Sequence, residues 1–249
     1  MNFFNNFFAS TPIPENHDLK ILMLAGAMYV EENGILESIH ENVDQNSTDE
    51  VINEVLEEGF CSLDMNASDA DPEDVALLLQ DAWGVNSKND LLITLEELLS
   101  GIHQKILLDL IFLNEQKILT LDEYRRRSEF SKLFEDHDDS TFEFTVNEAK
   151  KLNQVSGPTG IIAWDWARYV HLLRLAFLAD MIEEEEAWTH LKRLKQPMKK
   201  TFSNWEQFAQ SFTHGRGFWL QSSDSFSDIM DSLLKDPWSP WTKLGWFPN

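Results

Sequence analysis

Cysteine is the scarcest residue in this sequence, and basic residues are few beside acidic ones, with 20 Lys and Arg against 43 Asp and Glu. The single cysteine, Cys61, cannot form an internal disulfide, so nothing indicates an oxidising compartment. No apolar run approaches the length of a membrane span, and residues 1–8 lack the basic region and continuous apolar core of a signal peptide. We therefore expect a cytoplasmic protein that does not bind membranes.

The sequence also lacks the short motifs that indicate chemistry. It contains no Walker loop, dinucleotide fingerprint or nucleophile elbow. The seven histidines are scattered without the spacing of a zinc site, and residues 64–74 lack the glycine and the final glutamate of a calcium loop. A reactive thiol needs a lowered pKa, whereas the acidic neighbours of Cys61 would raise its pKa. We expect neither a metal nor a cofactor.

Positive charge is almost absent from the first half of the chain. Residues 1–124 carry 25 acidic and 4 basic side chains, a net charge of −21, whereas residues 125–249 carry 18 and 16, a net charge of −2. No lysine stands between Lys20 and Lys88. Such a field repels nucleic acid and attracts a basic protein partner. The carboxylates that we expect to bind this partner are Glu31, Glu32, Glu37, Glu41, Glu54, Glu57, Glu58, Asp64, Asp71 and Asp74.

A solvated acidic surface is the alternative to a binding face. In that case the partner contacts are made by the phenylalanines of residues 3–8 or by the aromatic residues of the C-terminal tail, 236–249. The phenylalanines could also pack on their own domain, because exposed aromatic patches are uncommon in monomers.

Hydrophobic residues make up 43% of the 249 residues, with nine Trp and seventeen Phe, which is ample for a sizeable core. Their spacing is helical almost throughout, so we predict an all-α, multi-helix globular bundle with irregular, aromatic-rich termini. Residues 1–70 would form an acidic helical segment packed on a main helical domain of residues 71–249. The expected helices cover residues 18–30, two parts of 35–56 divided near 46–49, 72–83, 90–99, 101–113, 121–134, 144–152 and 161–179.

Two local signals are clear in this series. Asp71 and Pro72 form a helix start, because aspartate accepts from the first free amides and proline suits the first helical position. Residues 141–146 alternate like a strand, but nothing else in the chain would pair with them.

Residues 160–219 organise the rest and read as three consecutive helices. The first, 161–179, is apolar on nearly every side and should be central. Its polar exceptions include Asp165, Arg168 and Arg174. We expect Asp165 and Arg168 to pair along the helix, with Trp164, Trp188, Trp205 and Trp219 close by, and Arg174 to find an acidic partner in 183–186.

The charges on this helix also allow a functional interpretation. Asp165 could act as a general base while Arg168 or Arg174 binds an anionic substrate, with Glu186 nearby, which would make the protein a hydrolase or transferase. No nucleophile or glycine-rich loop supports this alternative, so we favour a structural ion-pair network and a protein that is not an enzyme.

Several motifs of residues 160–219 resemble those of a known protein family. Trp164-Asp165 with Ala167-Arg168, then Glu186-Ala187-Trp188, Phe202-Ser203-x-Trp205-Glu206-x-Phe208 and Gly215-Arg216-x-x-Trp219, resemble a bacterial family, domain-of-unknown-function family 1266. Trp83-Gly84-Val85 and His103 resemble the opening of the same domain, so the likeness covers about residues 77–220. Asp180 departs from the glycine expected at its turn. The resemblance implies a helical bacterial protein and brings no activity, cofactor or catalytic residue.

These observations together favour a non-enzymatic acidic binding protein. Immunity proteins are commonly small, acidic and cytoplasmic, so the expected form is an immunity-type inhibitor that neutralises a basic bacterial toxin or effector by direct binding.

Overall fold

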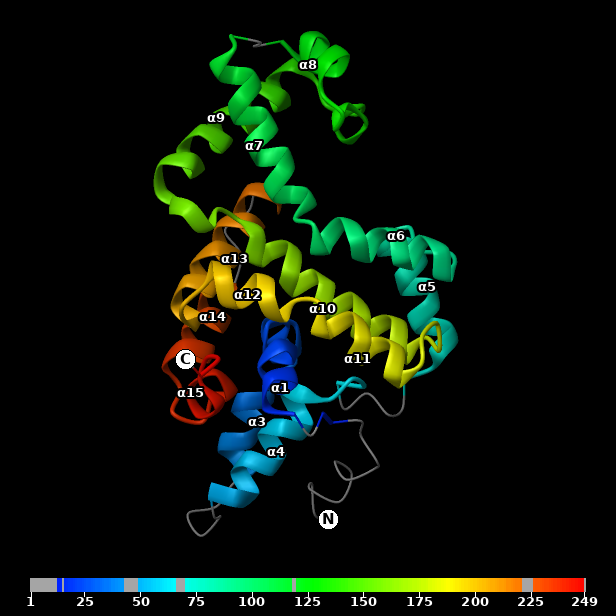
Figure 1. The fold of residues 1–249 in the computed structure, drawn as a ribbon, viewed down its shortest axis with the longest axis vertical. Coiled ribbons are helices and arrows are strands. Elements are labelled where there is room, and N and C mark those ends of the chain that lie inside the picture. The colour runs from blue at the N-terminus through cyan, green and yellow to red at the C-terminus, as the bar shows by residue number, and fades with distance from the viewer. Residues whose placement is uncertain are drawn as a thin grey trace.

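The computed structural model describes residues 13–14, 16–42, 49–65, 70–117, 120–220 and 226–248, except for the side chains of residues 42, 49, 50 and 158. Within these ranges the chain is helical and has no strand, which confirms the all-α prediction (Figure 1). The elements are α1 (His17–Leu24), α2 (Ala27–Glu31), α3 (Ile35–Asn42), α4 (Asp49–Cys61), α5 (Pro72–Trp83), α6 (Lys88–Leu99), α7 (Ile102–Glu115), α8 (Leu121–Arg127), η2 (Ser131–Phe134), α9 (Asp139–Val155), η3 (Gly157–Thr159), α10 (Ile162–Leu178), α11 (Glu184–Lys192), α12 (Lys195–Thr201), α13 (Trp205–Leu220), α14 (Phe226–Lys235) and α15 (Pro240–Leu244).

Helix α10 runs through the centre of the molecule (Figure 1). It packs against α5, α6, α7, α11 and α13. A helix with neighbours on so many sides must be apolar nearly all round, which is the pattern that its sequence shows. The predicted central helix, 161–179, is therefore confirmed to within one residue at each end.

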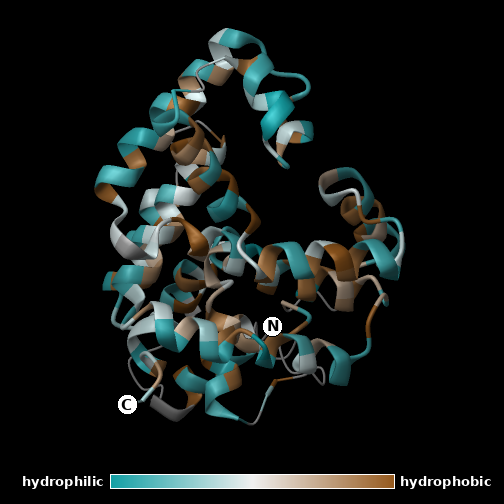
Figure 2. Ribbon diagram, turned by 45° about the horizontal axis from the view of Figure 1, so that its top comes forward, coloured by the Kyte–Doolittle hydropathy of each residue, from teal (hydrophilic) through white to brown (hydrophobic). Residues whose placement is uncertain are grey.

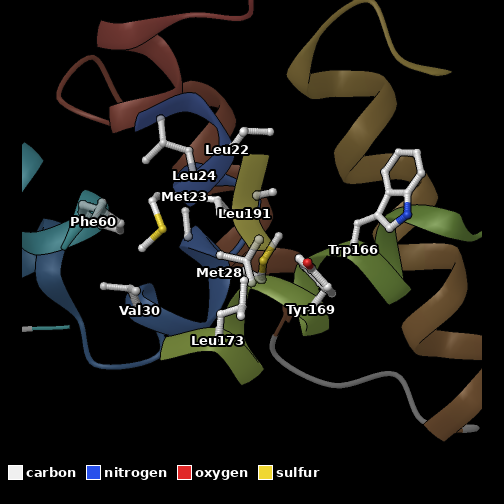
Figure 3. Close-up of a cluster of buried hydrophobic side chains, with 14 of the residues drawn as sticks. Leu22, Met23, Leu24, Met28, Val30, Phe60, Trp166, Tyr169, Leu173 and Leu191 are labelled. Atoms are coloured by element: carbon white, nitrogen blue, oxygen red, sulfur yellow. The ribbon is translucent and has the colours of Figure 1, made fainter. Parts of the chain in front are cut away.

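The N-terminal helices share the core of α10. Met23 and Met28 from α1 and α2 lie with Phe60 of α4, Leu173 of α10 and Leu191 of α11 in one buried cluster (Figure 3). Each such side chain contributes roughly 1.5–3 kcal/mol when it leaves water. Residues 17–61 and the later helices are thus held by one continuous apolar core.

Helices α7, α8 and α9 form an arm with a second, smaller core, at the top of Figure 1. Leu110, Tyr124, Phe134 and Phe142 lie in this core, and Phe218 of α13 joins it to the body of the molecule. Figure 2 shows hydrophobic and hydrophilic residues alternating along the arm, as helices with one buried face require.

Helix starts and stops follow the expected local chemistry where the signal is strong. The Asp71 side chain accepts from the amide of Glu73, Pro72 takes the first helical position and Gly84 ends α5 with φ +65°. Asp180 follows α10 with φ +53°, and the amide of Met181 donates to the carbonyl of Ala176. Asp180 therefore occupies a left-handed position at which glycine is normally favoured.

Several predicted helix boundaries are wrong, and α4 continues to Cys61, beyond the expected end at residue 56. The expected helix 18–30 is divided between α1 and α2 at Ala25 and Gly26. The expected helix 121–134 ends at Arg127, because Ser128 is extended and its hydroxyl donates to Asp109 at 2.5 Å. Helix α9 begins before 144, because Asp138 accepts from the amide of Thr141 at 2.7 Å and caps it, so the strand-like residues 141–146 are helical.

The last third of the chain holds more helix than expected. Residues 160–219 form four helices, α10 to α13, instead of three, and the tail contains the short helix α15. The tail is nevertheless held by its aromatic residues, since Trp241 stacks on Trp205 with ring centroids 4.7 Å apart and donates from Nε1 to the carbonyl of Leu24. The expected break at 46–48 and the phenylalanines of 3–8 lie outside the described residues.

Candidate functional site

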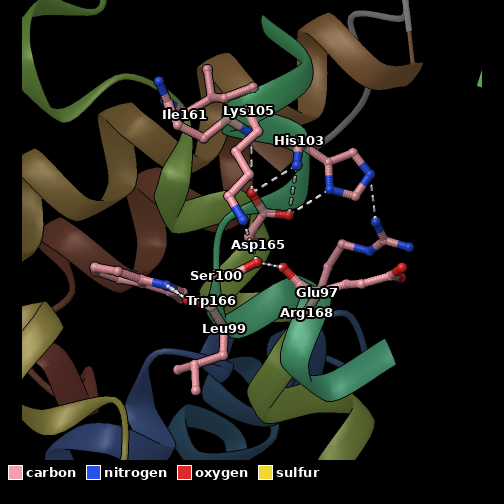
Figure 4. Close-up of polar contacts among 10 residues, drawn as sticks. Glu97, Leu99, Ser100, His103, Lys105, Ile161, Asp165, Trp166 and Arg168 are labelled. Atoms are coloured by element: carbon pink, nitrogen blue, oxygen red, sulfur yellow. Dashed lines mark hydrogen bonds and ion pairs between the residues drawn. The ribbon is translucent and has the colours of Figure 1, made fainter. Parts of the chain in front are cut away.

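Asp165 is fully buried on α10 and caps helix α7 from outside that helix (Figure 4). Its carboxylate accepts from the amides of His103 at 3.2 Å and Gln104 at 3.3 Å. These amides are free donors because Gly101, at the N-cap of α7, has no side chain to accept from them. Asp165 supplies the missing acceptor, and its charge suits the positive end of the helix.

His103 lies between Asp165 and Arg168. Its Nδ1 is 2.5 Å from Asp165 Oδ1, and its Nε2 is 3.1 Å from Arg168 Nη1. A guanidinium can only donate, so Nε2 accepts and Nδ1 carries the proton that is donated to the carboxylate. The expected direct pair of Asp165 and Arg168 is thus wrong, because His103, 62 positions before Asp165, bridges them.

Aromatic rings surround this bridge. The guanidinium carbon of Arg168 lies 4.6 Å from the ring centroid of Trp83 and 5.2 Å from that of Trp164, and Trp219 meets His103 edge-on at 4.3 Å. Burial lowers the pKa of Arg168.

Two of the four tryptophans expected beside this bridge make their recorded contacts elsewhere. Trp205 stacks on Trp241, and Trp188 donates to Glu184. Trp164 and Trp219 are therefore the members of the predicted set that the structure places at Asp165, His103 and Arg168.

Arg174 points to another part of the molecule. Its side chain is fully buried, and its Nη2 donates to the carbonyls of Met23, at 3.3 Å, and Phe60. Burial lowers its pKa to about 10. The prediction that Arg174 pairs with a carboxylate of residues 183–186 is therefore wrong. Glu186 of that segment accepts instead from Lys88 at 2.6 Å. The four residues of the enzyme hypothesis therefore do not form one constellation.

The ten candidate partner-binding carboxylates differ in exposure. Glu31 is buried and accepts from the amide of Leu36, and burial raises its pKa to about 7. Glu57 pairs with Lys20 at 2.5 Å. Glu58 is half-buried, and burial, then Glu54 and Asp64, raise its pKa. Asp64 is also half-buried, whereas the exposed members are Glu32, Glu37, Glu41, Glu54, Asp71 and Asp74.

Other chemistry has little support in the described part of the chain. No group of three or more His, Cys, Asp or Glu there could hold a metal ion. Cys61 is buried, and burial raises the pKa of its thiol to about 12, with Glu57 adding a smaller effect in the same direction. Among the described residues, no helix has both the length and the apolar character needed to cross a bilayer.

Residues 78–246 match the model of a known family, described as a protein of unknown function, DUF1266. The chain belongs to this family. The match confirms the resemblance drawn from the tryptophan motifs and extends it to residue 246. It includes Trp83, His103, Asp165, Arg168 and Arg216, so the bridge on α10 lies wholly inside the DUF1266 region.

A relative in Escherichia coli strain K12, the uncharacterized protein YbeR, is 24% identical over 156 residues. The matched part is 63% of this chain and 63% of the relative's length. No solved structure matches the chain.

Proposed function

We propose that this DUF1266 protein is a non-enzymatic binding protein that holds a basic protein partner on exposed carboxylates of α3, α4 and α5. The observation that carries the proposal is the uncompensated charge of this region. No lysine or arginine occurs between Lys20 and Lys88, and among the described residues Glu37, Glu41 and Glu54 form no ion pair. Exposed carboxylates without neighbouring cations repel one another. A basic partner would remove that repulsion.

The form of this function that we propose is an immunity-type inhibitor of a basic toxin or effector, acting in the cytoplasm. An acidic inhibitor gains most from electrostatic attraction in the rate of encounter, because opposite fields steer the partner before contact. The inhibitor needs no reaction of its own. Asp165, Arg174 and Glu186 contact different parts of the molecule, which is compatible with a protein that catalyses no reaction.

The test begins with capture of the partner from the native cell, followed by binding kinetics with the purified partner. The variant carries Glu37→Lys, Glu41→Lys and Glu54→Lys. The matched control reverses the same number of exposed charges outside the acidic half, at Glu143, Glu183 and Glu185. We expect the association rate to fall at least about ten-fold in the variant, and much less in the control.

Salt gives an independent check of the same proposal. Raising the salt from about 0.05 M to about 0.5 M shortens the screening length several-fold, so association should slow markedly while dissociation changes less. Association that does not depend on salt would refute the acidic surface as the binding face.

A hydrolase or transferase is the second candidate, and the His103–Asp165 pair is the observation that favours it. A histidine held by a buried carboxylate is a common acid–base arrangement. Here, however, Nε2 of His103 already accepts from Arg168, so Arg168 would have to move before His103 could take a proton. Neighbouring genes offer a cheap test, since a secreted toxin gene favours the inhibitor and a metabolic operon favours the enzyme.

A further inference from the structure

A groove lies between α5 and the turn that joins α10 to α11. Its volume is about 320 Å³, at the lower end of the roughly 300–1,000 Å³ of ligand pockets. Figure 1 shows α5 at the right-hand edge of the molecule, with this turn beside it. The side chains that line the groove from α5 are mostly exposed, so the groove opens to solvent and a group from another molecule can enter it.

The lining of this groove is largely apolar. One face of α5 packs against α10, whereas Leu77 of α5 is 56% exposed and lines the groove. Ala76, Val85 and Met181 extend the apolar lining, and the flexible thioether of methionine can adapt to what binds. A single exposed leucine is common on protein surfaces, but apolar side chains gathered around a hollow and bordered by polar groups are typical of an interaction site.

Carboxylates border the apolar lining on both segments that form the groove. Glu73 lines it from the first turn of α5. In the turn after α10, Asp180 precedes Met181 and Glu183 follows it. These three carboxylates are exposed, and none of them forms an ion pair with another residue in the described part of the chain. The groove therefore combines apolar surface with negative charge that the protein does not neutralise.

The sequence around the groove supplies no cation of its own. No lysine or arginine occurs in residues 21–87, which include α5, or in residues 175–191, which include the turn. Lys88 comes next, but its ammonium group pairs with Glu186 at 2.6 Å. Carboxylates left in this state attract cationic groups from solution. A second copy of this chain is a poor occupant, because two molecules of net charge −23 repel one another.

We propose that this groove holds an apolar side chain of the basic protein partner, from a segment in which lysines or arginines flank that side chain. The apolar side chain packs on Leu77 and Met181, and the flanking cations face the carboxylates of both segments. Amphipathic segments bind proteins in this manner, with an apolar anchor in a groove and polar contacts at its edges. The assignment rests on the proposed function, since it takes the partner to be basic, and it adds the kind of residue that anchors that partner.

The probes are two synthetic peptides of equal length and equal lysine content. One carries leucines at helical spacing, and in the other glutamines replace the leucines. Each peptide is titrated into the full chain, isotopically labelled at its methionine methyl groups, and the methyl signals are followed by NMR. Met181→Leu identifies the signal of Met181 by removing it. Because Met181 lines the groove, its signal reports occupation there, whereas the fully buried Met198 serves as an internal reference.

We expect the leucine peptide to shift the Met181 signal saturably and to bind at least about ten-fold more tightly than the glutamine peptide. Leu77→Gln should weaken binding of the leucine peptide at least about ten-fold. Leu108→Gln is the matched control, because Leu108 on α7 is 52% exposed and does not line the groove. Both leucines are exposed, so both variants should fold. Leu77→Ala is a milder truncation that replaces Leu77→Gln if the latter unfolds.

The charge at the groove has its own pair of variants. Glu73→Lys should slow association of the leucine peptide several-fold, because a cation then stands where the peptide's lysines are expected. Glu143→Lys changes an exposed carboxylate of α9 by the same amount and should have a much smaller effect.

Four results overturn the assignment. Equal affinities of the two peptides mean that acidic attraction acts without the groove, and equal losses in the Leu77 and Leu108 variants mean that the groove is not used. A Met181 signal that shifts in the free protein when serine replaces the phenylalanines of residues 3–8 assigns the groove to the chain itself. Self-association that Leu77→Gln abolishes assigns it to a second copy.

Failure of the groove and failure of the proposed function are distinguishable. The proposed function is tested with the captured partner and the variant at Glu37, Glu41 and Glu54, none of which lines the groove. The peptide titration uses neither that partner nor that variant. A partner whose association is slowed by salt but is unaffected by Leu77→Gln would leave the acidic binding face standing without the groove.

Discussion

Replacing Asp165 by alanine is the sharpest test of the fold around α10. The change leaves the amides of His103 and Gln104 without an acceptor, and it leaves Nδ1 of His103 without its carboxylate. Loss of a helix cap costs roughly 1 kcal/mol, and a stranded buried donor costs about 1–3 kcal/mol. These losses are not independent, so we expect the free energy of unfolding to fall by about 3 kcal/mol.

Urea unfolding followed by circular dichroism measures this change as a lower midpoint with an unchanged slope. For a chain of this length the same loss corresponds to a melting temperature lower by roughly 6–12 °C. Asp165→Asn keeps one acceptor oxygen and should lose about half as much. Asp81→Ala, at an exposed position of α5, is the control and should change stability by less than about 0.5 kcal/mol.

The reasoning is refuted if Asp165→Ala is as stable as the parent. If that stable variant also loses a measurable activity, Asp165 acts in a reaction and the enzyme hypothesis gains the support that the geometry does not now provide.

Three further changes test other parts of the structure. Asp180→Gly should raise the free energy of unfolding by about 1 kcal/mol, because glycine adopts φ +53° without strain, and Asp180→Ala should not; urea unfolding compares them. Gly215→Ala should lower the free energy of unfolding by roughly 1–3 kcal/mol in a thermal melt, because the added Cβ would collide with Trp164 and lie 3.0 Å from the carbonyl oxygen of Ile161. In the control, Gly217→Ala, the added Cβ meets no atom within contact distance, so this variant should stabilise α13 slightly. Glu31 has a pKa of about 7 in the folded protein and about 4.5 in the unfolded chain, so the unfolded state releases its proton first as pH rises. The free energy of unfolding should therefore fall between these two pH values. Urea titrations over this pH range should show a smaller fall for Glu31→Gln.

Local patterns predicted much of the architecture. The all-round apolar character of residues 161–179 places α10 at the centre, and the Asp71-Pro72 pair marks the start of α5. These features depend on a few adjacent residues, so the sequence displays them directly. Where local signals conflict, as in 141–146, burial of Phe142, Thr145 and Val146 along one side of a helix decides the outcome.

The polar partners could not be predicted from the same patterns. His103 reaches Asp165 across 62 positions, and Arg174 reaches the carbonyls of Phe60 and Met23 across 114 and 151 positions. Spacing within a helix suggests neighbours three or four positions apart, and the sequence therefore suggested Arg168 for Asp165. Main-chain carbonyls leave no trace in a sequence, so the surroundings of Arg174 required the fold.

The buried guanidinium of Arg174 ties the family region to the helices that precede it. Its acceptors lie at Met23 and Phe60, before the DUF1266 match begins at residue 78. A fragment cut at that boundary would leave a cation facing the space where α1 and α4 had been, and it would bare the apolar side of α10 to water. We therefore expect residues 78–249 alone to be less stable than the full chain, because residues 17–61 supply both the acceptors of Arg174 and part of the apolar cover of α10.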